Sequence, residues 1–300
     1  MKKLYCIFIT LLLVLFTSCS NNEIDKYKLS IVAPNGAPSI SLVDLRYNND
    51  SYEFTLGVDP TILQGHFVSK NMDFIVAPIN LGTKMYQKNK NYKLAGVITW
   101  GNLYFASKKE FTIEDMNNND VVFFGENTIN DAVVKYILNN KKISPKIEYL
   151  GTTALTQSKL LSDDKIVLIA EPSLTQAKMK NNNIYSISVE ELFKEITGIY
   201  GFPQAGLFVK ADSIKEHKKI VDEFISKARS SAIATSNDLE NVAKKAEELG
   251  LGKASILTNA IPKCNIRFTS AIDSKNDILK FIEFDYINSF FGMIDEEFFY

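Results

Sequence analysis

The chain has 300 residues, of which 46% are hydrophobic, so it can bury a sizeable core and usually divides into two lobes. Its 34 basic residues nearly balance 35 acidic ones, which gives a formal net charge of −1. Because binding to a phosphate backbone needs a concentrated basic surface, this balance argues against a nucleic-acid partner.

The N-terminus has the pattern of an export signal. Two lysines precede an apolar run over residues 7–16, which is too short to span a bilayer comfortably. The Phe-Thr-Ser-Cys motif that ends at Cys19 resembles the bacterial lipoprotein box, whose cysteine receives a diacylglyceryl group. The resemblance implies a signal peptide over residues 1–18, lipidation of Cys19, a polar tether over residues 19–27 and an extracytoplasmic protein anchored to the cell membrane. An uncleaved helix or a plain signal peptide is the alternative.

Cysteine usage agrees with this interpretation. Cys6 lies in the signal and Cys19 at the anchor, so Cys264 is alone in the remaining chain. A single thiol cannot form an intramolecular disulfide, and the fold must therefore rely on its apolar core.

After the tether, short apolar strands alternate with amphipathic helices. Strands are predicted at residues 29–33, 54–58, 74–77 and 94–99. Helices follow the first three strands; Pro38 and Pro60 suit first helical turns, and Asp59 suits an N-cap.

The pattern then repeats. Strands are predicted at residues 121–124, 147–150, 166–170 and 207–209, and the chain beyond residue 213 is predicted to be almost wholly helical. Strands that alternate with helices indicate parallel sheets covered on both faces. We therefore expect an α/β protein with two mostly parallel sheets flanked by helices.

Two crossings between the sheets are predicted. They assign residues 28–103 plus 205–300 to lobe one and residues 104–204 to lobe two. Two connections between two lobes make a hinge.

Recognisable catalytic chemistry is missing from the sequence. It contains only two histidines, His66 and His217, and it lacks metal-ligand spacing, a phosphate loop and a Gly-x-Ser-x-Gly elbow. We expect no catalytic residue, no metal and no cofactor.

Polar residues, glycines and prolines recur instead where the predicted strands end. Ligands of open α/β sheets bind at the carboxyl ends of strands, where helix N-termini present unpaired N–H groups. The predicted ligand-binding residues are Asn35, Gly36, Pro38, Asn80, Trp100, Asn102, Tyr104, Thr128, Thr152, Glu171 and Gln204. Ordinary turn chemistry is the alternative for each turn, and a place in the core is the alternative for Trp100, the only tryptophan.

Several of these segments resemble one family. Residues 31–38, 73–82, 97–104, 169–172 and 201–205 are similar to the substrate-binding proteins of nitrate/sulfonate/taurine/thiamine-precursor ABC importers. The resemblance implies a two-lobed periplasmic-binding-protein fold of type II, a small-molecule ligand, and docking onto a permease coupled to an ATPase. We further expect a monomer.

The ligand is left open by the resemblance. The arginines Arg46, Arg229 and Arg267 lie outside the strand-end turns, whereas a sulfonate often uses a guanidinium fork. The polar and aromatic residues favour a flat heterocycle, such as a pyrimidine-type thiamine precursor, over a sulfonate-like or nitrate-like solute. Two alternatives are an enzyme on the same fold, similar to pyrimidine-precursor synthases or chorismate dehydratases, and a surface interaction protein that has lost transport.

Overall fold

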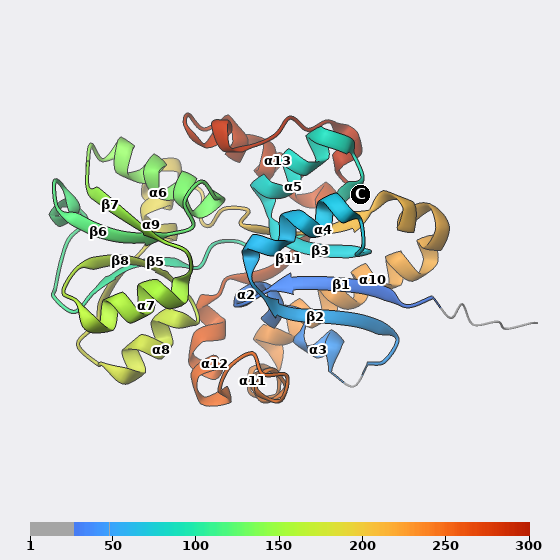
Figure 1. Cartoon of the computed structure of the whole chain (residues 1–300), viewed down its shortest axis with the longest axis horizontal. Coiled ribbons are helices and arrows are strands. Elements are labelled where there is room, and N and C mark those ends of the chain that lie inside the picture. The colour runs from blue at the N-terminus through green and yellow to red at the C-terminus, as the bar shows by residue number, and fades with distance from the viewer. Residues whose placement is uncertain (1–26, 48) are drawn as a thin grey trace, which may run out of the picture.

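Two α/β lobes lie side by side in the computed structural model, which describes residues 27–47 and 49–300 (Figure 1). The first lobe contains a six-stranded sheet of order β11-β4-β10-β3-β1-β2. Its strands are β1 (Leu29–Pro34), β2 (Tyr52–Val58), β3 (Phe74–Pro78), β4 (Tyr92–Thr99), β10 (Ala205–Lys210) and β11 (Ile266–Ser270). The predicted signal peptide and Cys19 lie outside the described residues, as does the tether up to residue 26.

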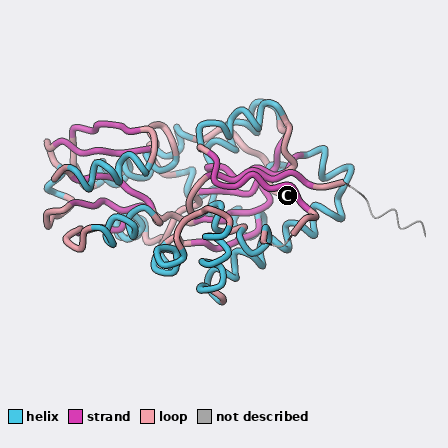
Figure 2. Tube along the Cα trace, turned by 60° about the horizontal axis from the view of Figure 1, so that its bottom comes forward, coloured by secondary structure: helices cyan, strands magenta, loops and turns pink. Residues whose placement is uncertain are grey.

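The second lobe contains a five-stranded sheet of order β7-β6-β8-β5-β9. Its strands are β5 (Leu103–Ser107), β6 (Asp120–Phe124), β7 (Lys146–Leu150), β8 (Ile166–Ala170) and β9 (Tyr185–Ser188). Its helices are α6 (Ile129–Asn140), α7 (Thr153–Ser162), α8 (Ser173–Lys180) and α9 (Val189–Thr197), with η2 (Glu114–Met116) between β5 and β6. Figure 2 shows the two groups of strands separated from each other and flanked by helices.

Helices cover both faces of the first sheet. The helical segments of this lobe are α2 (Ala37–Ile40), α3 (Val43–Arg46), η1 (Pro60–Ile62), α4 (Leu63–Ser69), α5 (Ile79–Asn89), α10 (Ala211–Asn237), α11 (Leu239–Glu248), α12 (Ala254–Ala260), η3 (Ile261–Lys263), α13 (Ala271–Glu283) and η5 (Glu296–Phe298), whereas η4 (Ile287–Phe290) packs on the second lobe. Apolar side chains of α4, α5 and α13 share one core cluster, and those of α3 and α10 share another. The predicted N-cap Asp59 is confirmed, because its side chain accepts a hydrogen bond from the Thr61 backbone N–H.

Both sheets are mixed. Strands β1, β2 and β3 are parallel, as are β6, β7 and β8, which matches the prediction for strands joined by helical crossovers. The strands next to the crossings differ: β10 is antiparallel to β3 and β4, and β5 is antiparallel to β8 and β9. A strand that enters a sheet directly from the other lobe need not follow the direction set by the helical crossovers.

Three strands, β5, β9 and β11, were not predicted. Each has only four or five residues. The prediction of an almost wholly helical chain beyond residue 213 is wrong at β11, which occupies an edge of the first sheet. Strands β9 and β11 are short edge strands, whose apolar periodicity is weak, so sequence patterns detect them poorly. No helix of the described chain is both long and apolar enough to cross a membrane.

The chain passes to the second sheet at residues 100–102 and returns over residues 198–204. Strand β5 begins at Leu103, a residue that the prediction assigned to the first lobe. The prediction also placed the whole C-terminal part in the first lobe, but Phe281 and Ile287 belong to the core cluster of the second.

Candidate functional site

A network of amide side chains lies where the two crossings meet. The Gln204 side-chain amide donates to Asn102 Oδ1 and to Asn130 Oδ1, both at 3.0 Å. Asn102 in turn donates to the Glu171 carbonyl at 3.1 Å and accepts from the Glu171 backbone N–H at 3.0 Å. The network therefore joins both crossings to two elements of the second lobe, α6 and the end of β8.

The first lobe fixes the position of Gln204 through its backbone. Its N–H donates to the Thr99 carbonyl at 3.0 Å, and its carbonyl accepts from the Ile79 N–H at 3.1 Å. Ile79 is the first residue of α5, and Asn130 is the second residue of α6. The N-termini of one helix from each lobe therefore flank the Gln204 side chain and backbone.

Two buried polar atoms beside this network have no hydrogen-bond partner among the described residues. They are Asn80 Oδ1, in a side chain on the first turn of α5, and Thr99 Oγ1, at the end of β4. Asn80 is 4% exposed and Thr99 is fully buried. Leaving such a group unpaired costs about 1–3 kcal/mol, so atoms of this kind mark a place where a ligand or water binds.

The wall of the site brings together turns that are far apart in sequence. Gly36 has φ = +89°, a conformation that favours glycine, and a Cβ there would lie 3.9 Å from both the Glu171 carbonyl oxygen and Pro172 Cδ. The strand-end turn after β1 thus lies close to the strand-end turn after β8 across the lobes. The Glu171 carboxylate accepts the Thr175 N–H at 3.1 Å and its hydroxyl at 2.9 Å, and burial raises the pKa of this carboxyl. It is the backbone of Glu171, therefore, that joins the network.

Two helix N-termini at this interface lack side-chain caps. Helices α5 and α6 begin after Pro78 and Thr128, neither of which caps its helix with a side-chain hydrogen bond, whereas in α8 the Glu171 carboxylate takes the Thr175 N–H. Thr128 instead donates its hydroxyl to the Gly125 carbonyl at 2.6 Å. N-terminal N–H groups that no side chain satisfies are suited to oxygen atoms of a ligand.

Trp100 lies in the core of the first lobe rather than on an open wall. Its side chain is 3% exposed, its indole N–H donates to the Arg267 carbonyl at 3.0 Å, and the Arg267 guanidinium lies 4.5 Å from the ring centroid. In this conformation the ring offers almost no surface on which a ligand could stack.

The other predicted residues are dispersed. Asn35 is exposed, Pro38 is half-buried in the short helix α2, and Thr152 caps α7 by accepting from the Leu155 N–H. The structure brings Gly36, Asn80, Asn102, Gln204 and the Glu171 backbone together. Thr99 and Asn130 were not predicted to bind a ligand, although Thr99 begins a predicted strand-end turn and Asn130 lies two residues after another such turn.

Tyr104 lines a separate hollow of about 170 Å³ at the hinge. The hollow is lined by Gly101, Tyr104, Glu190, Tyr200, Pro262, Lys263 and Asn265, which come from both lobes and both crossings. Glu190 is 3% exposed, and its carboxylate accepts from the Leu103 N–H at 2.9 Å and the Ser188 hydroxyl at 3.1 Å. Burial raises the pKa of Glu190 to about 7.

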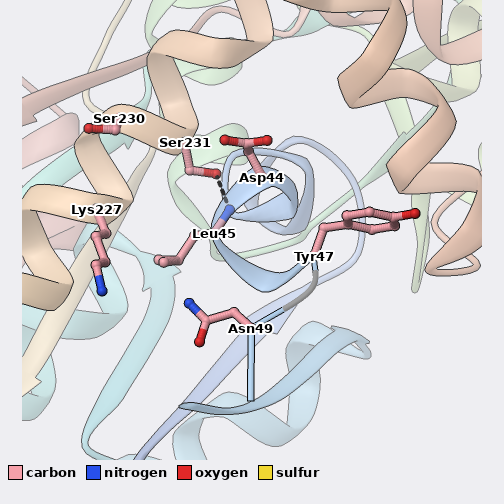
Figure 3. Close-up of a pocket in the computed structure, with 7 residues that line it drawn as sticks. All are labelled: Asp44, Leu45, Tyr47, Asn49, Lys227, Ser230 and Ser231. Atoms are coloured by element: carbon pink, nitrogen blue, oxygen red, sulfur yellow. Dashed lines mark hydrogen bonds between the residues drawn. The ribbon is translucent and has the colours of Figure 1, made fainter. Parts of the chain in front are cut away.

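A further hollow, of about 240 Å³, belongs to the first lobe alone (Figure 3). It lies between α3 and α10, where the Ser231 hydroxyl accepts from the Leu45 N–H at 3.1 Å. Its charged side chains are already paired, Asp44 with Lys245 and Lys227 with Glu223. We do not assign a function to this hollow, because only the first lobe contributes to it.

Comparisons with known proteins identify the architecture. No family model and no curated protein matches the chain. Among solved structures, an ABC transporter from Parabacteroides distasonis superposes with a TM-score of 0.75 at 21% identity, over 91% of this chain and 98% of the other. This chain has the periplasmic-binding-protein fold.

Two further structures share this periplasmic-binding-protein fold. One is the ligand-binding component of an ABC-type import system from Staphylococcus aureus with zinc bound, at a TM-score of 0.67 and 14% identity over 90% of this chain and 97% of that one. The other is the alkanesulfonate-binding protein SsuA from Xanthomonas axonopodis pv. citri bound to MOPS. Its TM-score is 0.61 and its sequence identity 14%, over 83% of this chain and 89% of that one. The predicted two-lobed type II fold is confirmed. Across the part of the chain described here, no three histidine, cysteine, aspartate or glutamate side chains are grouped to hold a metal ion.

Proposed function

We propose that the protein is the extracytoplasmic solute-binding component of an ABC importer and that it binds a small ligand between its lobes. The observation that carries this proposal is the amide network of Gln204, Asn102 and Asn130, beside which Asn80 and Thr99 each hold a buried polar atom without a protein partner. Polar groups from both lobes meet there, at the strand ends where α/β folds bind ligands. The fold of the solved ABC-transporter proteins supports the same function.

A ligand that touches both lobes favours their closed arrangement, and its differential affinity for the closed state sets the population shift. The closed form would deliver the solute to a permease coupled to an ATPase. Lipidation at Cys19 would keep a monomeric binding protein at the membrane that holds this permease.

Two ligand classes suit the site. Amide side chains dominate the network, and none of its members carries a positive charge, which favours an uncharged hydrogen-bonding heterocycle such as a pyrimidine-type thiamine precursor. The uncapped N-termini of α5 and α6 favour ligand oxygens and so support a sulfonate-like or nitrate-like solute, the class named for the Xanthomonas protein. We propose the heterocycle, because none of the side chains that form the amide network is cationic and desolvating an unpaired anion is costly.

The alternative is an enzyme on the same fold. General acid–base chemistry needs a titratable group within reach of the ligand. The buried carboxylate of Glu171, whose backbone joins the network, is already bound by the backbone and side chain of Thr175. We therefore propose that the protein binds its ligand without transforming it; recovery of a chemically altered ligand after incubation would favour the enzyme.

Calorimetric titration against pyrimidines, sulfonates and nitrate tests this proposal. Asn80→Ala and Asn130→Ala each remove one amide, in the first and second lobe respectively, and each should weaken binding about tenfold, the effect of one lost hydrogen bond. Asn183→Ala, in an exposed loop, is the matched control and should bind like the wild type. A ligand that binds both site variants with wild-type affinity would show that the site is elsewhere. Saturable binding of sulfonates alone would discard the heterocycle.

A further inference from the structure

The C-terminal part of the chain leaves the first lobe, enters the core of the second and returns. Helix α13 begins on the first lobe, where Ala271 and Ile278 belong to a core cluster with residues of α4, α5 and β4. Phe281, three residues after Ile278, belongs to the core cluster of the second lobe, as does Ile287 in η4. One helix therefore contributes to the cores of both lobes.

The residues that enter the second lobe are mainly aromatic, and we call Phe281, Phe284 and Ile287 the plug. The Phe281 ring stacks on Phe202 with centroids 6.0 Å apart and planes at 11°. The Phe284 ring lies 5.3 Å from that of Tyr136 in α6. Ile287 is fully buried. Apolar groups with this degree of burial cannot leave the second lobe without exposing its core to water.

The return to the first lobe is anchored closely. The Gly292 N–H donates to the Thr83 hydroxyl at 3.1 Å, and a Cβ on Gly292 would lie only 2.5 Å from the Thr83 carbonyl oxygen. Phe291 packs against the core clusters of both lobes. Beyond it, Phe298 is buried in the first lobe, and the Tyr300 N–H donates to the Leu94 carbonyl at 2.8 Å.

We propose that residues 281–292 form a strap that ties the lobes together in addition to the two crossings and limits how far they open. The strap is fixed to the first lobe at both ends, by α13 and by Gly292, and between these ends the Phe281 and Ile287 side chains are buried in the core of the second lobe. Since Phe202 lies in the return crossing, its stacking on Phe281 places the strap beside the hinge. Opening of the lobes must therefore bend the strap or pull the plug out of the second lobe. The anchor at Gly292 and the burial of the plug resist these changes.

This inference does not depend on any ligand and can be tested without one. Spin labels on Val68→Cys in α4 and Met179→Cys in α8 report the distance between lobes, since these side chains are 61% and 54% exposed. Cys264 is fully buried, burial raises the pKa of its thiol, and it should not be labelled. Cys6 and Cys19 are replaced by serine in the full-length chain.

Two variants attack the two ends of the strap. Phe284→Ala removes a plug ring from the second lobe, whereas Gly292→Ala forces the strap away from Thr83 without altering the second lobe's core. Each should shift the inter-lobe distance to larger values and broaden its distribution at least twofold. Met293→Ala changes a side chain that is 76% exposed, in the residue directly after the strap, and should leave the distribution unchanged.

Circular dichroism establishes that each variant is folded. If Phe284→Ala disrupts the second lobe, Gly292→Ala decides the question alone. A folded Gly292→Ala protein with the wild-type distance distribution would overturn the proposal, because the strap would then not limit opening.

Discussion

The hinge carboxylate of Glu190 should make the stability of this protein depend on pH near neutrality. Burial raises its pKa from the ordinary 4.5 to about 7, and nearby Glu191 adds to the increase. Because the folded chain then binds more protons than the unfolded chain between these values, the free energy of unfolding falls as pH rises through this interval. At 1.36 kcal/mol per pKa unit, the full loss is about 3 kcal/mol, and about 2 kcal/mol of it falls between pH 5.5 and 8.5.

Glu190→Gln removes this pH-dependent contribution to the free energy of unfolding and keeps an oxygen that can accept from the Leu103 N–H. Urea unfolding at pH 5.5, 7 and 8.5 should show the variant gaining stability over the wild type as pH rises, by about 2 kcal/mol across the range. The charged groups facing this part of the hinge are Glu191 and Lys263. The pKa values of the Tyr104 and Tyr200 phenols are raised and lie far above this pH range.

Glu191→Gln is the matched control, since it makes the same charge change on a side chain that is 56% exposed. It should alter the pH profile little, because this side chain is largely exposed to water in the folded chain, as it is in the unfolded chain. A stability difference between wild type and Glu190→Gln that stays constant from pH 5.5 to 8.5 would refute the argument, since Glu190 would then not titrate in this range.

Three other predictions follow from burial and pairing. Trp100→Ala should lower the free energy of unfolding by about 3–5 kcal/mol, as other buried large-to-small substitutions do. An unchanged urea midpoint would contradict this prediction, because the ring would then have to be exposed. Asp131→Asn should lower the free energy of unfolding by about 1–3 kcal/mol, because it weakens the hydrogen bonds that the buried carboxylate accepts from Lys135 at 2.9 Å and from Tyr149 at 2.5 Å. Thermal denaturation measures the loss, and a variant with the wild-type melting temperature would contradict the prediction. Cys264 should react with a thiol reagent only after unfolding, as mass spectrometry can show; rapid labelling of the native chain would mean that its surroundings open.

Local patterns predicted much of the fold. The strands β1, β3, β6 and β8 are apolar runs followed by turn residues and amphipathic helices, and these features are encoded within a few neighbouring residues. The same turns identified Gly36 and Asn102, and the position of a predicted crossing identified Gln204; the structure brings these residues to one place. That these turns lie near one another could be predicted from the sequence, because the carboxyl ends of parallel strands lie at one edge of a sheet.

Contacts between distant segments were decided only by the tertiary structure. The sequence placed Trp100 at a strand end, but its burial depends on Arg267, which is far along the chain. An apolar pattern shows that Phe281 and Ile287 are buried, yet it cannot show which of two cores receives them. By itself the sequence determined where most strands, helices and polar turns occur, because those depend on near neighbours. The pairing of the lobes and the C-terminal strap depend on packing across the whole chain, which only the folded structure fixes.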